Sequence, residues 1–274
     1  MKDKRILITG CAGSIGSELV RQLYKDNKIY GLDINETGVF DVISDYGISG
    51  RVGDIRNPAV IEDAFSDFKP QIIFHTAAYK HVPLMEKYPL EAIQTNIVGT
   101  YNLIHYAKKY RETTERFIFI SSDKAVQSTS IMGATKRMGE IMCRNQGEGF
   151  TVVRFGNVLG SRGSVIPIWQ KQINEGKEVT VTDTLMERYM MTIEEACNLV
   201  IEACKRGVGG EIYILDMGKP VNILDLAKKI IKESGKEIKI KITGMRSGEV
   251  LTERLMSEEE ERTAVKEDKF YIIR

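Results

Sequence analysis

The stretch Arg5-Ile6-Leu7-Ile8-Thr9-Gly10-Cys11-Ala12-Gly13-Ser14-Ile15-Gly16 joins a short apolar run to a glycine-rich turn. The apolar run over 5–9 is typical of a buried strand, and the residues after the turn place Ile15, Leu19 and Leu23 on one face of a helix over 14–24. The glycines permit a tight turn and let backbone N–H groups approach a phosphate at the positive end of that helix. The segment therefore predicts a strand, a phosphate-binding turn and a helix, although a glycine-rich turn without a ligand has the same pattern.

Segments of strand length and amphipathic segments of helix length alternate along the first 160 residues. This alternation predicts an α/β fold with a doubly wound parallel sheet of the Rossmann type. The expected strands are 5–9, 28–33, 71–76, 116–121 and 151–157, and the expected helices are 14–24, 58–68, 89–110 and 131–144.

The alternation of strand and helix segments becomes less regular after Gly160, where a second unit is expected. Strands are expected at 179–183, 211–216 and 238–243, and helices at 193–205 and 223–234. We expect a dinucleotide-binding Rossmann domain from residues 1–160 plus about 190–217. A smaller C-terminal α/β substrate lobe is expected from about 161–189 plus 218–274.

The composition limits the classes of partner and site. The chain has 274 residues, of which 42% are hydrophobic, and carries 39 Lys and Arg against 38 Asp and Glu, for a formal charge of +1. This balance makes nucleic acid an unfavourable main partner, because no strong basic field exists. No uninterrupted apolar run approaches the roughly 18 residues of a membrane span, and no signal-type run is present. The chain has four cysteines and three histidines, and their spacing is not that of metal ligands, so no metal site is expected. The cysteines are expected to be free thiols, which favours a cytoplasmic location.

A carboxylate at the end of the second expected strand indicates the cofactor. Asp33 lies 17 residues beyond Gly16, where a carboxylate accepts both ribose hydroxyls of NAD and repels the extra phosphate of NADP. No Arg or Lys follows closely to bind that phosphate. NAD is therefore the expected cofactor and NADP the alternative, while Asp33 as the cap of the next turn is the structural alternative. Asp54 is expected either to reach the adenine edge or to cap the following helix.

Polar residues at the tip of another strand indicate the reaction centre. Ser121-Ser122-Asp123-Lys124 ends the strand 116–121, and ligands in such sheets bind beyond the carboxyl ends of the strands. Further along the chain, Met132 and Lys136 are four positions apart and share one face of the helix 131–144. An ordinary surface ion pair at Asp123 and Lys124, and an ordinary core methionine at Met132, are the alternatives.

The glycine turn and the helix 131–144 resemble the extended short-chain dehydrogenase/reductase superfamily. In that superfamily the helix carries Tyr-x-x-x-Lys, and the tyrosinate removes a hydroxyl proton while NAD takes a hydride. Met132 occupies the tyrosine position, and a thioether cannot take up a proton.

Nearly the whole chain resembles the nucleotide-sugar 4,6-dehydratases more narrowly, chiefly those that act on UDP-N-acetylglucosamine. The Asp123-Lys124 pair is the most discriminating element of this resemblance. The chain departs from the family pattern at Gln127-Ser128, where Asn-Pro is common, and at Val250, where lysine is common. The matching stretches are 77–86, 95–100, 122–126, 132–137, 154–165, 210–218 and 246–249.

The resemblance implies a lyase (hydro-lyase) that converts UDP-N-acetylglucosamine to a UDP-4-keto-6-deoxy-N-acetylhexosamine, with tightly bound and recycled NAD. Lys124 would remove the proton from sugar C5, and Asp123 would protonate the departing C6 hydroxyl. Lys124 must then be neutral and Asp123 protonated, which a closed and desolvated site favours. Lys136, Asp123 or a water held by Ser122 is expected to deprotonate the C4 hydroxyl.

The motifs and the resemblance together give three groups of site residues. The expected catalytic group is Ser122, Asp123, Lys124, Met132 and Lys136. The expected cofactor-binding residues are Gly10, Gly13, Ser14, Ile15, Gly16, Asp33, Asp54, Ile55, Ala77, Ala78, Asn96 and Lys136. The expected substrate-binding residues are Lys80, His81, Asn157, Ser161, Arg162, Arg246 and Glu249, with the three cations near the diphosphate and Glu249 on a ribose diol.

Two other functions remain open at this point. A nucleotide-sugar 4-epimerase uses the same hydride step without an acid–base pair for elimination, and a non-catalytic NAD-binding regulator would need neither Asp123 nor Lys124. UDP, GDP and dTDP sugars are not distinguished, and neither are retention and inversion at C5. The resemblance also implies a homo-oligomer, a dimer or larger, in which helices 89–110 and 131–144 pair across the interface.

Overall fold

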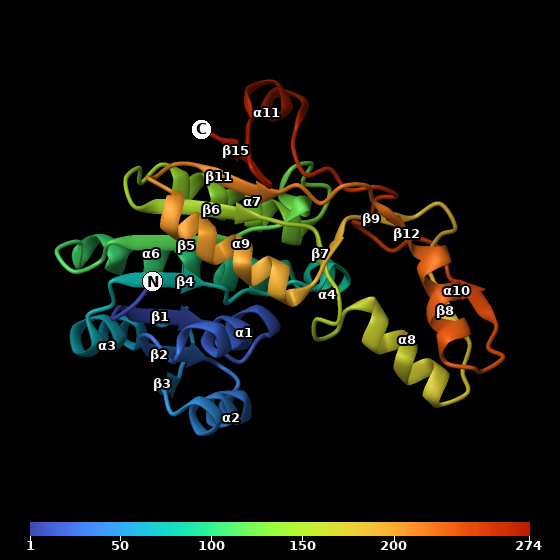
Figure 1. Cartoon of the computed structure of the whole chain (residues 1–274), viewed down its shortest axis with the longest axis horizontal. Helices are drawn as coiled ribbons and strands as arrows, with labels where there is room; N and C mark the ends of the chain where they lie inside the picture. Colours follow the sequence, from blue (N-terminus) through green and yellow to red (C-terminus); the bar gives the residue numbers. More distant parts are fainter.

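A nine-stranded sheet forms the centre of the larger domain in the computed structural model, which describes residues 1–274, and the smaller lobe extends from one side of that domain (Figure 1). The strand order is β14-β15-β11-β6-β5-β4-β1-β2-β3, and the strands from β11 to β3 are all parallel to their neighbours. This confirms the predicted doubly wound sheet. The strands are β1 (Arg5–Thr9), β2 (Lys28–Asp33), β3 (Ser49–Val52), β4 (Ile72–His75), β5 (Arg116–Ile120), β6 (Phe150–Arg154), β11 (Ile212–Leu215), β14 (Val265–Glu267) and β15 (Phe270–Ile273).

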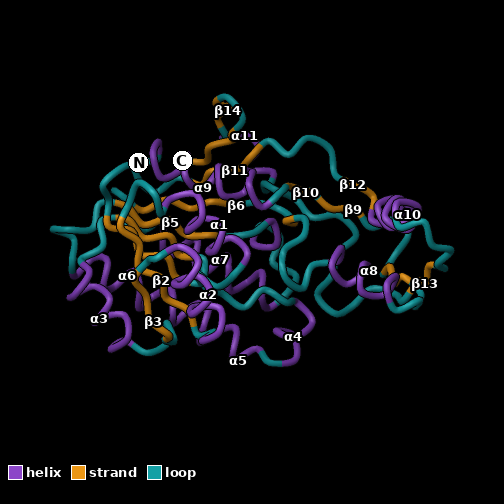
Figure 2. The backbone as a smooth tube through the Cα atoms, turned by 60° about the horizontal axis from the view of Figure 1, so that its bottom comes forward, coloured by secondary structure: helices purple, strands orange, loops and turns teal.

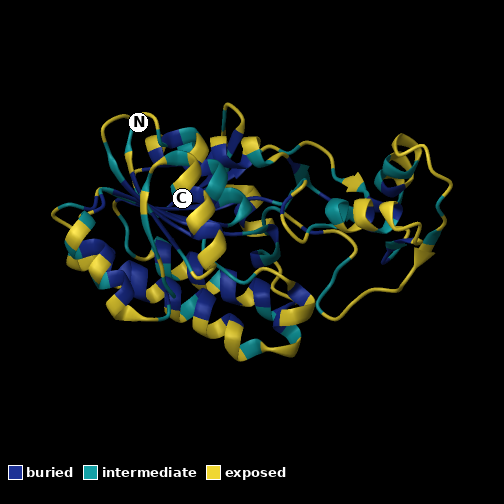
Figure 3. Cartoon of the chain, turned by 90° about the horizontal axis from the view of Figure 1, so that it is seen from below, coloured by how far each residue is buried: buried dark blue, intermediate teal, exposed yellow.

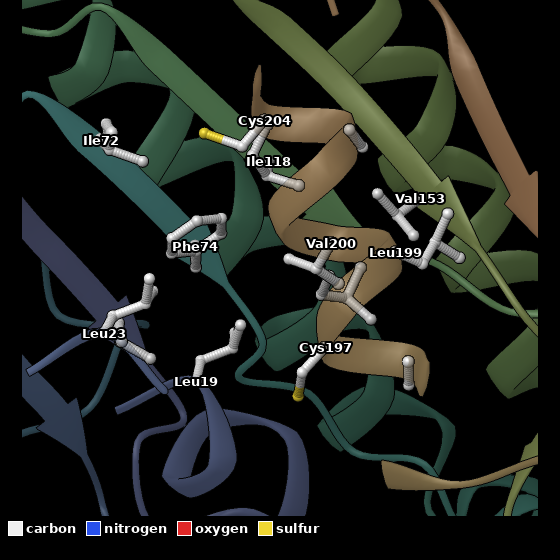
Figure 4. Close-up of a cluster of buried hydrophobic side chains, with 14 of the residues drawn as sticks. Leu19, Leu23, Ile72, Phe74, Ile118, Val153, Cys197, Leu199, Val200 and Cys204 are labelled. Atoms are coloured by element: carbon white, nitrogen blue, oxygen red, sulfur yellow. The ribbon is translucent and has the colours of Figure 1, made fainter. Parts of the chain in front are cut away.

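Alternate residues of the strands bury the two faces of the sheet against different helices. On one face Ile6 and Ile8 of β1 pack with apolar residues of α1 (Ser14–Leu23), α2 (Glu36–Tyr46) and α9 (Ile193–Arg206). Figure 4 shows part of this cluster, with Leu19 of α1 and Val200 of α9 over Phe74 and Ile118. On the other face Leu7 packs with α3 (Pro58–Phe68), α6 (Thr100–Lys109) and α7 (Ile131–Arg144).

The long helix expected at 89–110 is present but does not have one regular winding. It begins as α5 (Pro89–Ala92), continues as a π-helical segment over Ile93–Gly99, and becomes α6 at Thr100. A short helix, α4 (Val82–Lys87), precedes it. Such π-helical turns are frequent at functional sites, and this one lies beside the loop that follows β4.

The smaller lobe has a core of its own, separate from the sheet (Figures 1 and 2). Trp169 and Ile173 of α8 (Val165–Asn174) pack against Ile223 and Ala227 of α10 (Ile223–Glu233) and against strand β8 (Val179–Val181). The remaining short strands are β7 (Asn157–Val158), β9 (Glu187–Arg188), β10 (Met190–Met191), β12 (Val221–Asn222) and β13 (Ile240–Ile242).

The end of the chain corrects the expected domain boundary. The prediction placed all of 218–274 in the smaller lobe, but β14 and β15 add to the edge of the large sheet as antiparallel strands. The physical reason is the apolar content of β15, because Phe270, Ile272 and Ile273 are buried against the sheet's two cores. Helix α11 (Glu258–Thr263) precedes these strands, and its Glu260 bonds to β6. Only the earlier part of this stretch belongs to the lobe.

No helix of the structure has both the length and the apolar character needed to cross a membrane. The outer faces of the helices are instead exposed, while the strands between them are buried (Figure 3).

Candidate active site

Two adjoining hollows lie beyond the carboxyl ends of the parallel strands. The first, of about 250 Å³, lies between the ends of β1 and β2 and is called the small hollow; the second, of about 500 Å³, extends toward β7 and α8 and is called the large cleft. Both are lined by Gly13, Thr76, Ala78, Tyr79 and Arg162. They therefore form one continuous surface, long enough to hold an extended ligand whose two ends differ in chemistry.

The glycine turn has the geometry of a backbone cradle. Gly10 has φ 72°, and a Cβ there would lie 2.6 Å from the backbone nitrogen of Ala77. A Cβ at Gly16 would collide with the carbonyl oxygen of Gly10, so glycine is needed where α1 approaches the turn. No side chain caps the first turn of α1 at Gly13, which leaves its N–H groups for an anion. Ser14 Oγ accepts a hydrogen bond of 3.0 Å from the backbone N–H of Arg162.

Asp33 lies at the end of β2 on the wall of the small hollow. Its two oxygens accept hydrogen bonds of 3.0 Å from the N–H groups of Ala12 and Asn35, so the carboxylate is fixed against the glycine turn. Asp54 also lines this hollow and is held by Arg56 at 2.6 Å, and the buried Ile55 lines it as well. The only cation that lines this hollow is Arg162, so the carboxylates dominate its charge.

Ala77 and Ala78 also line the small hollow, whereas Asn96 lies behind its wall. The Asn96 amide accepts from the N–H of Tyr79 at 2.8 Å and donates to the carbonyl of Tyr79 at 2.9 Å. Its nitrogen also donates to Thr135 Oγ1 at 3.0 Å. All of this bonding fixes the loop after β4 against α7, so Asn96 positions the wall and does not face the hollow.

The Asp123-Lys124 pair forms a single 3-10 turn at the carboxyl end of β5. Lys124 lines the large cleft, and its Nζ donates to Asp123 Oδ1 at 3.0 Å. Ser122 also lines the cleft, and its hydroxyl donates to the same Oδ1 at 2.8 Å. The structure therefore brings these three expected catalytic residues together.

The second oxygen of Asp123 has a different environment. Asp123 is 1% exposed, and its Oδ2 is buried without any hydrogen-bond partner. This oxygen lies near Gly156, which lines the large cleft and where a Cβ would approach it to 3.4 Å. A buried carboxylate oxygen without a donor is costly, and although Asp123 does not itself line the cleft, this oxygen lies next to a residue that does.

Helix α7 places Met132 and Lys136 on the cleft wall. Lys136 Nζ donates to the carbonyl of Ile120 at 2.8 Å and lies 5.0 Å from the centre of the Phe119 ring. Burial lowers the pKa of Lys136 to about 8, against the opposing effect of Glu140. Met132 is 3% exposed and also packs in a small apolar cluster with residues of α4 and α5, so it is both a core residue and a wall residue.

The far side of the large cleft carries polar and cationic side chains. Lys80 Nζ donates to Ser161 Oγ at 3.4 Å, and burial lowers the pKa of Lys80. His81 lies against Gly163, and burial together with the neighbouring Lys80 lowers the pKa of its imidazole. Asn157 Oδ1 is buried and has no partner.

Arg246 and Glu249 are not brought into the cleft. Arg246 Nε pairs with Glu249 Oε1 at 3.3 Å, and the Arg246 N–H donates to the other oxygen at 2.9 Å. The side chain of Arg246 is 57% exposed, and neither residue lines either hollow. Their loop packs through Gly248 against Ser130, the cap of α7, and Val82 of α4.

The comparisons with known proteins agree with this geometry. A family model described as "Polysaccharide biosynthesis protein" matches residues 6–274. The chain belongs to this polysaccharide biosynthesis protein family. The predicted resemblance to the extended short-chain dehydrogenase/reductase superfamily is thereby confirmed.

Relatives of this polysaccharide biosynthesis protein carry different names. The capsular polysaccharide biosynthesis protein CapD of Staphylococcus aureus is 45% identical over 278 residues, which cover 95% of this chain and 46% of CapD. The chain thus spans about half the length of the first curated relatives it matches. A protein named UDP-glucose 4-epimerase from Rickettsia prowazekii (strain Madrid E) is 34% identical, over 94% of this chain and 79% of its own length.

Several solved structures have the same fold as this chain. Pen from Bacillus thuringiensis superposes with a TM-score of 0.92 at 36% identity, covering 99% of this chain and 88% of Pen. DesIV, a dTDP-glucose 4,6-dehydratase from Streptomyces venezuelae solved with NAD and TYD bound, has a TM-score of 0.82 over 94% of this chain and 90% of its own. Its identity is 23%, so that likeness concerns the fold alone.

Sequence reasoning missed one charged residue that contacts Lys124. Glu253 Oε1 lies 3.6 Å from Lys124 Nζ, and Glu253 lines neither hollow. Glu253 is 6% exposed, and burial raises its pKa. No local motif could have identified it, because its partner lies in a distant part of the chain. The only clue in the sequence is that Glu253 follows closely after the Arg246–Glu249 stretch, which matches the family pattern.

Proposed function

We propose that the chain is an NAD-dependent UDP-N-acetylglucosamine 4,6-dehydratase, a hydro-lyase that makes a UDP-4-keto-6-deoxy-N-acetylhexosamine. The observation that carries this proposal is the buried and unpartnered Oδ2 of Asp123, which lies beside a lysine that lines the cleft. A neighbouring acid and base, of which Lys124 lines the cleft, are what an elimination needs. Met132 stands where the superfamily has its tyrosine base, and a thioether cannot accept a proton. The proton transfers would therefore depend on Asp123 and Lys124.

The small hollow and the glycine turn fit NAD. The uncapped N–H groups of α1 would hold the diphosphate, Asp33 the adenosine ribose, and Lys136 the nicotinamide ribose. NAD held there would supply a hydride acceptor for sugar C4 and a hydride donor for C6. A 2′-phosphate beside Asp33 would meet a carboxylate and no lysine, which favours NAD over NADP.

The proton movements use the chain's own residues. Asp123 accepts the proton of the C4 hydroxyl on its unpartnered oxygen and donates a proton to the C6 hydroxyl as water departs. Lys124, in its neutral form, takes the proton from C5 and gives it back there after elimination. Two protons leave the sugar and two return, so the residues finish each turnover in their initial states. Ser122 holds Oδ1 of Asp123 and thereby orients the carboxylate.

The far wall of the large cleft would bind the nucleotide diphosphate. Lys80 and Arg162 supply positive charge there, and Ser161 and Asn157 supply hydrogen-bonding atoms. In this arrangement Arg246 would have to leave Glu249 before it could bind a phosphate.

A 4-epimerase is the second candidate, because a relative of similar length carries that name. Epimerisation needs the hydride step and a base for the C4 hydroxyl, but it does not need a second proton-transfer residue beside C5 and C6. An epimerase would not need both Lys124 and the unpartnered oxygen of Asp123 for proton transfer.

One assay tests the proposal against both alternatives. The purified protein is incubated with UDP-N-acetylglucosamine without added cofactor, and the product is analysed by mass spectrometry. Loss of one water supports the dehydratase and shows that cofactor is retained and recycled. An unchanged mass with altered stereochemistry indicates the epimerase, and an unchanged sugar across UDP, GDP and dTDP substrates indicates a non-catalytic regulator.

A matched variant assigns the base. Lys124→Ala is expected to abolish water loss, at least about 100-fold in rate, while bound cofactor is retained, because Lys124 does not line the small hollow. The control is Lys228→Ala on the exposed face of α10, which should dehydrate at the wild-type rate. Retained turnover in Lys124→Ala would contradict the assigned role.

A further inference from the structure

Glu253 is a buried carboxyl group that the proposed chemistry does not use. It lies between the smaller lobe and α11, and its side chain is 7% exposed. Its Oε1 is 3.6 Å from Lys124 Nζ, and it lines neither hollow. Glu253 therefore contacts the proposed base without facing the substrate.

The backbone around Glu253 is fixed from both sides. Arg188 of β9 donates to the carbonyl of Leu251 and to that of Val250, each at 2.8 Å. Beyond Glu253, Arg154 of β6 donates to the carbonyl of Leu255 at 3.0 Å. Because two buried guanidinium groups anchor this segment, the approach of Glu253 to Lys124 is a built feature and not a chance surface contact.

The charges around Glu253 come from two elements. Lys124 and Asp123 face it from the turn after β5, and Arg188 faces it from β9. Burial raises the pKa of Glu253, Asp123 raises it further, and the two cations oppose this. On the cleft side, Lys136 of α7 is directed to the carbonyl of Ile120. Lys124, which lines the cleft, thus contacts two buried carboxylates, neither of which lines it.

We propose that Glu253 receives the proton that Lys124 carries at rest, and so makes Lys124 a neutral base; this inference rests on the proposed dehydratase function. In this step an N–H bond of the Lys124 ammonium breaks and an O–H bond forms on Glu253 Oε1. An ammonium and a carboxylate become an amine and a carboxylic acid, and nothing is oxidised or reduced. Glu253 does not touch the substrate, so it is a positioning residue that acts through Lys124.

The physical reason for the transfer is the loss of water when substrate fills the cleft. An ion pair is favoured over the neutral pair in water, but this preference falls as the surroundings become less polar. Asp123 cannot take this role, because its oxygens are bonded to Ser122 and Lys124 or reserved for the substrate. Glu253 is the second carboxylate within 4 Å of the ammonium.

The first test measures the coupling of the two groups directly. The protein is labelled with ¹³C at the lysine carbon next to the ammonium, and the Lys124 signal is assigned by its absence in Lys124→Arg. When UDP-N-acetylglucosamine fills the cleft at pH 7, the Lys124 signal of the wild type should move to the position of a neutral amine. In Glu253→Gln, which keeps the shape but cannot accept the proton, the signal should stay at that of an ammonium. Glu258→Gln, an exposed charge change further along the same segment, should behave as the wild type does. A Lys124 signal that responds in the same way in the wild type and in Glu253→Gln overturns the proposal.

The second test separates this role from a structural one. Glu253→Gln should lower kcat about tenfold or more at pH 7, and the deficit should shrink as the pH rises, because Lys124 must then lose its proton to solvent. An equal loss at every pH indicates a structural role and overturns the proposal. If the wild-type protein binds the nucleotide sugar but forms no dehydrated product, the proposed function fails, while the Lys124 signal still decides whether Glu253 takes the proton of that lysine.

Discussion

Asp123 bonds twice through one carboxylate oxygen and not at all through the other. In the proposed reaction the free oxygen handles the protons of the C4 and C6 hydroxyls. Asp123→Asn keeps the size of the side chain but removes its acid, so kcat for water loss should fall by about 100-fold or more. The measurement is single-turnover product analysis by mass spectrometry. Asp225→Asn, on an exposed face of the lobe, is the control, and wild-type turnover in Asp123→Asn would disprove the assignment.

Asp33 sets the expected cofactor preference at the small hollow. Since its carboxylate is fixed by Ala12 and Asn35, a 2′-phosphate cannot push it aside without breaking both hydrogen bonds. The cofactor-free protein should therefore bind NAD at least about tenfold more tightly than NADP by calorimetry, and Asp33→Ser should remove most of that difference. Glu36→Gln removes a nearby exposed charge and should leave the preference as it is. Equal affinities in the wild type would count against this role.

The residues that follow strands were the predictable part of the site. Asp33 ends β2 and Asp123 lies in the turn that follows β5, and parallel strands present their carboxyl ends at one edge of the sheet. Glu253 was not predictable, because its contact with Lys124 depends on how a distant loop packs. Asn96 illustrates the reverse case: its motif was recognised, but its side chain holds the Tyr79 backbone behind the wall.

At the scale of elements, α7 is pressed against β5 where Gly139 meets the Phe119 ring, and this contact positions Lys136. A Cβ at Gly139 would collide with the ring, so Gly139→Ala should destabilise the protein by about 1–3 kcal/mol despite the better helix propensity of alanine. Denaturant unfolding measures this change. Ala134→Ser adds one atom on the exposed face of the same helix and should have little effect. If Gly139→Ala were more stable than the wild type, the packing of Gly139 against the Phe119 ring would have to be looser than the structure shows.

Periodicity predicted the elements whose apolar face is long, such as α7 and α9. It did not predict α2, which is defined by its Asn35 cap and by Gly47 at φ 63° more than by an apolar stripe. It also placed β15 in the wrong domain, because a short strand at the sheet edge is assigned by its pairing with β11 and not by its own pattern.

At the scale of the whole molecule, a buried ion cluster ties the C-terminal segment to the sheet. Arg154 of β6 donates to Glu140 of α7 at 2.8 Å and to Glu260 of α11 at 2.8 Å. Burial by itself would raise the pKa of Glu260, but the hydrogen bonds and charge of Arg154 outweigh it and lower this pKa to about 2. The same cluster anchors Leu255, so it also holds the segment that carries Glu253.

The lowered pKa predicts how stability depends on pH. Glu260 is ionised in both the folded and the unfolded chain above its ordinary value of 4.5, so its stabilisation is complete there and is lost as the pH falls toward about 2. The pH-dependent part amounts to about 3 kcal/mol. Urea unfolding of the wild type and of Glu260→Gln should therefore differ most above pH 5 and converge in acid. A difference that is constant with pH would exclude this ionisation.

An exposed apolar surface on neighbouring helices predicts how copies of the chain assemble. Exposed apolar side chains lie along three adjoining helical segments, α5, the π-helical segment and α6, and continue on α7 beside them: Leu90, Ile93, Val98, Tyr101, Met138 and Ile141. Contiguous exposed apolar surface is uncommon on a monomer, and paired helices from two copies would bury it symmetrically. We therefore predict a homodimer through this face.

Leu90→Glu combined with Tyr101→Glu should give monomers in sedimentation velocity, because four carboxylates would be forced into the interface. Leu185→Glu, an equally exposed site on the smaller lobe, should remain dimeric. A wild-type protein that stays monomeric at micromolar concentration would rule this assembly out.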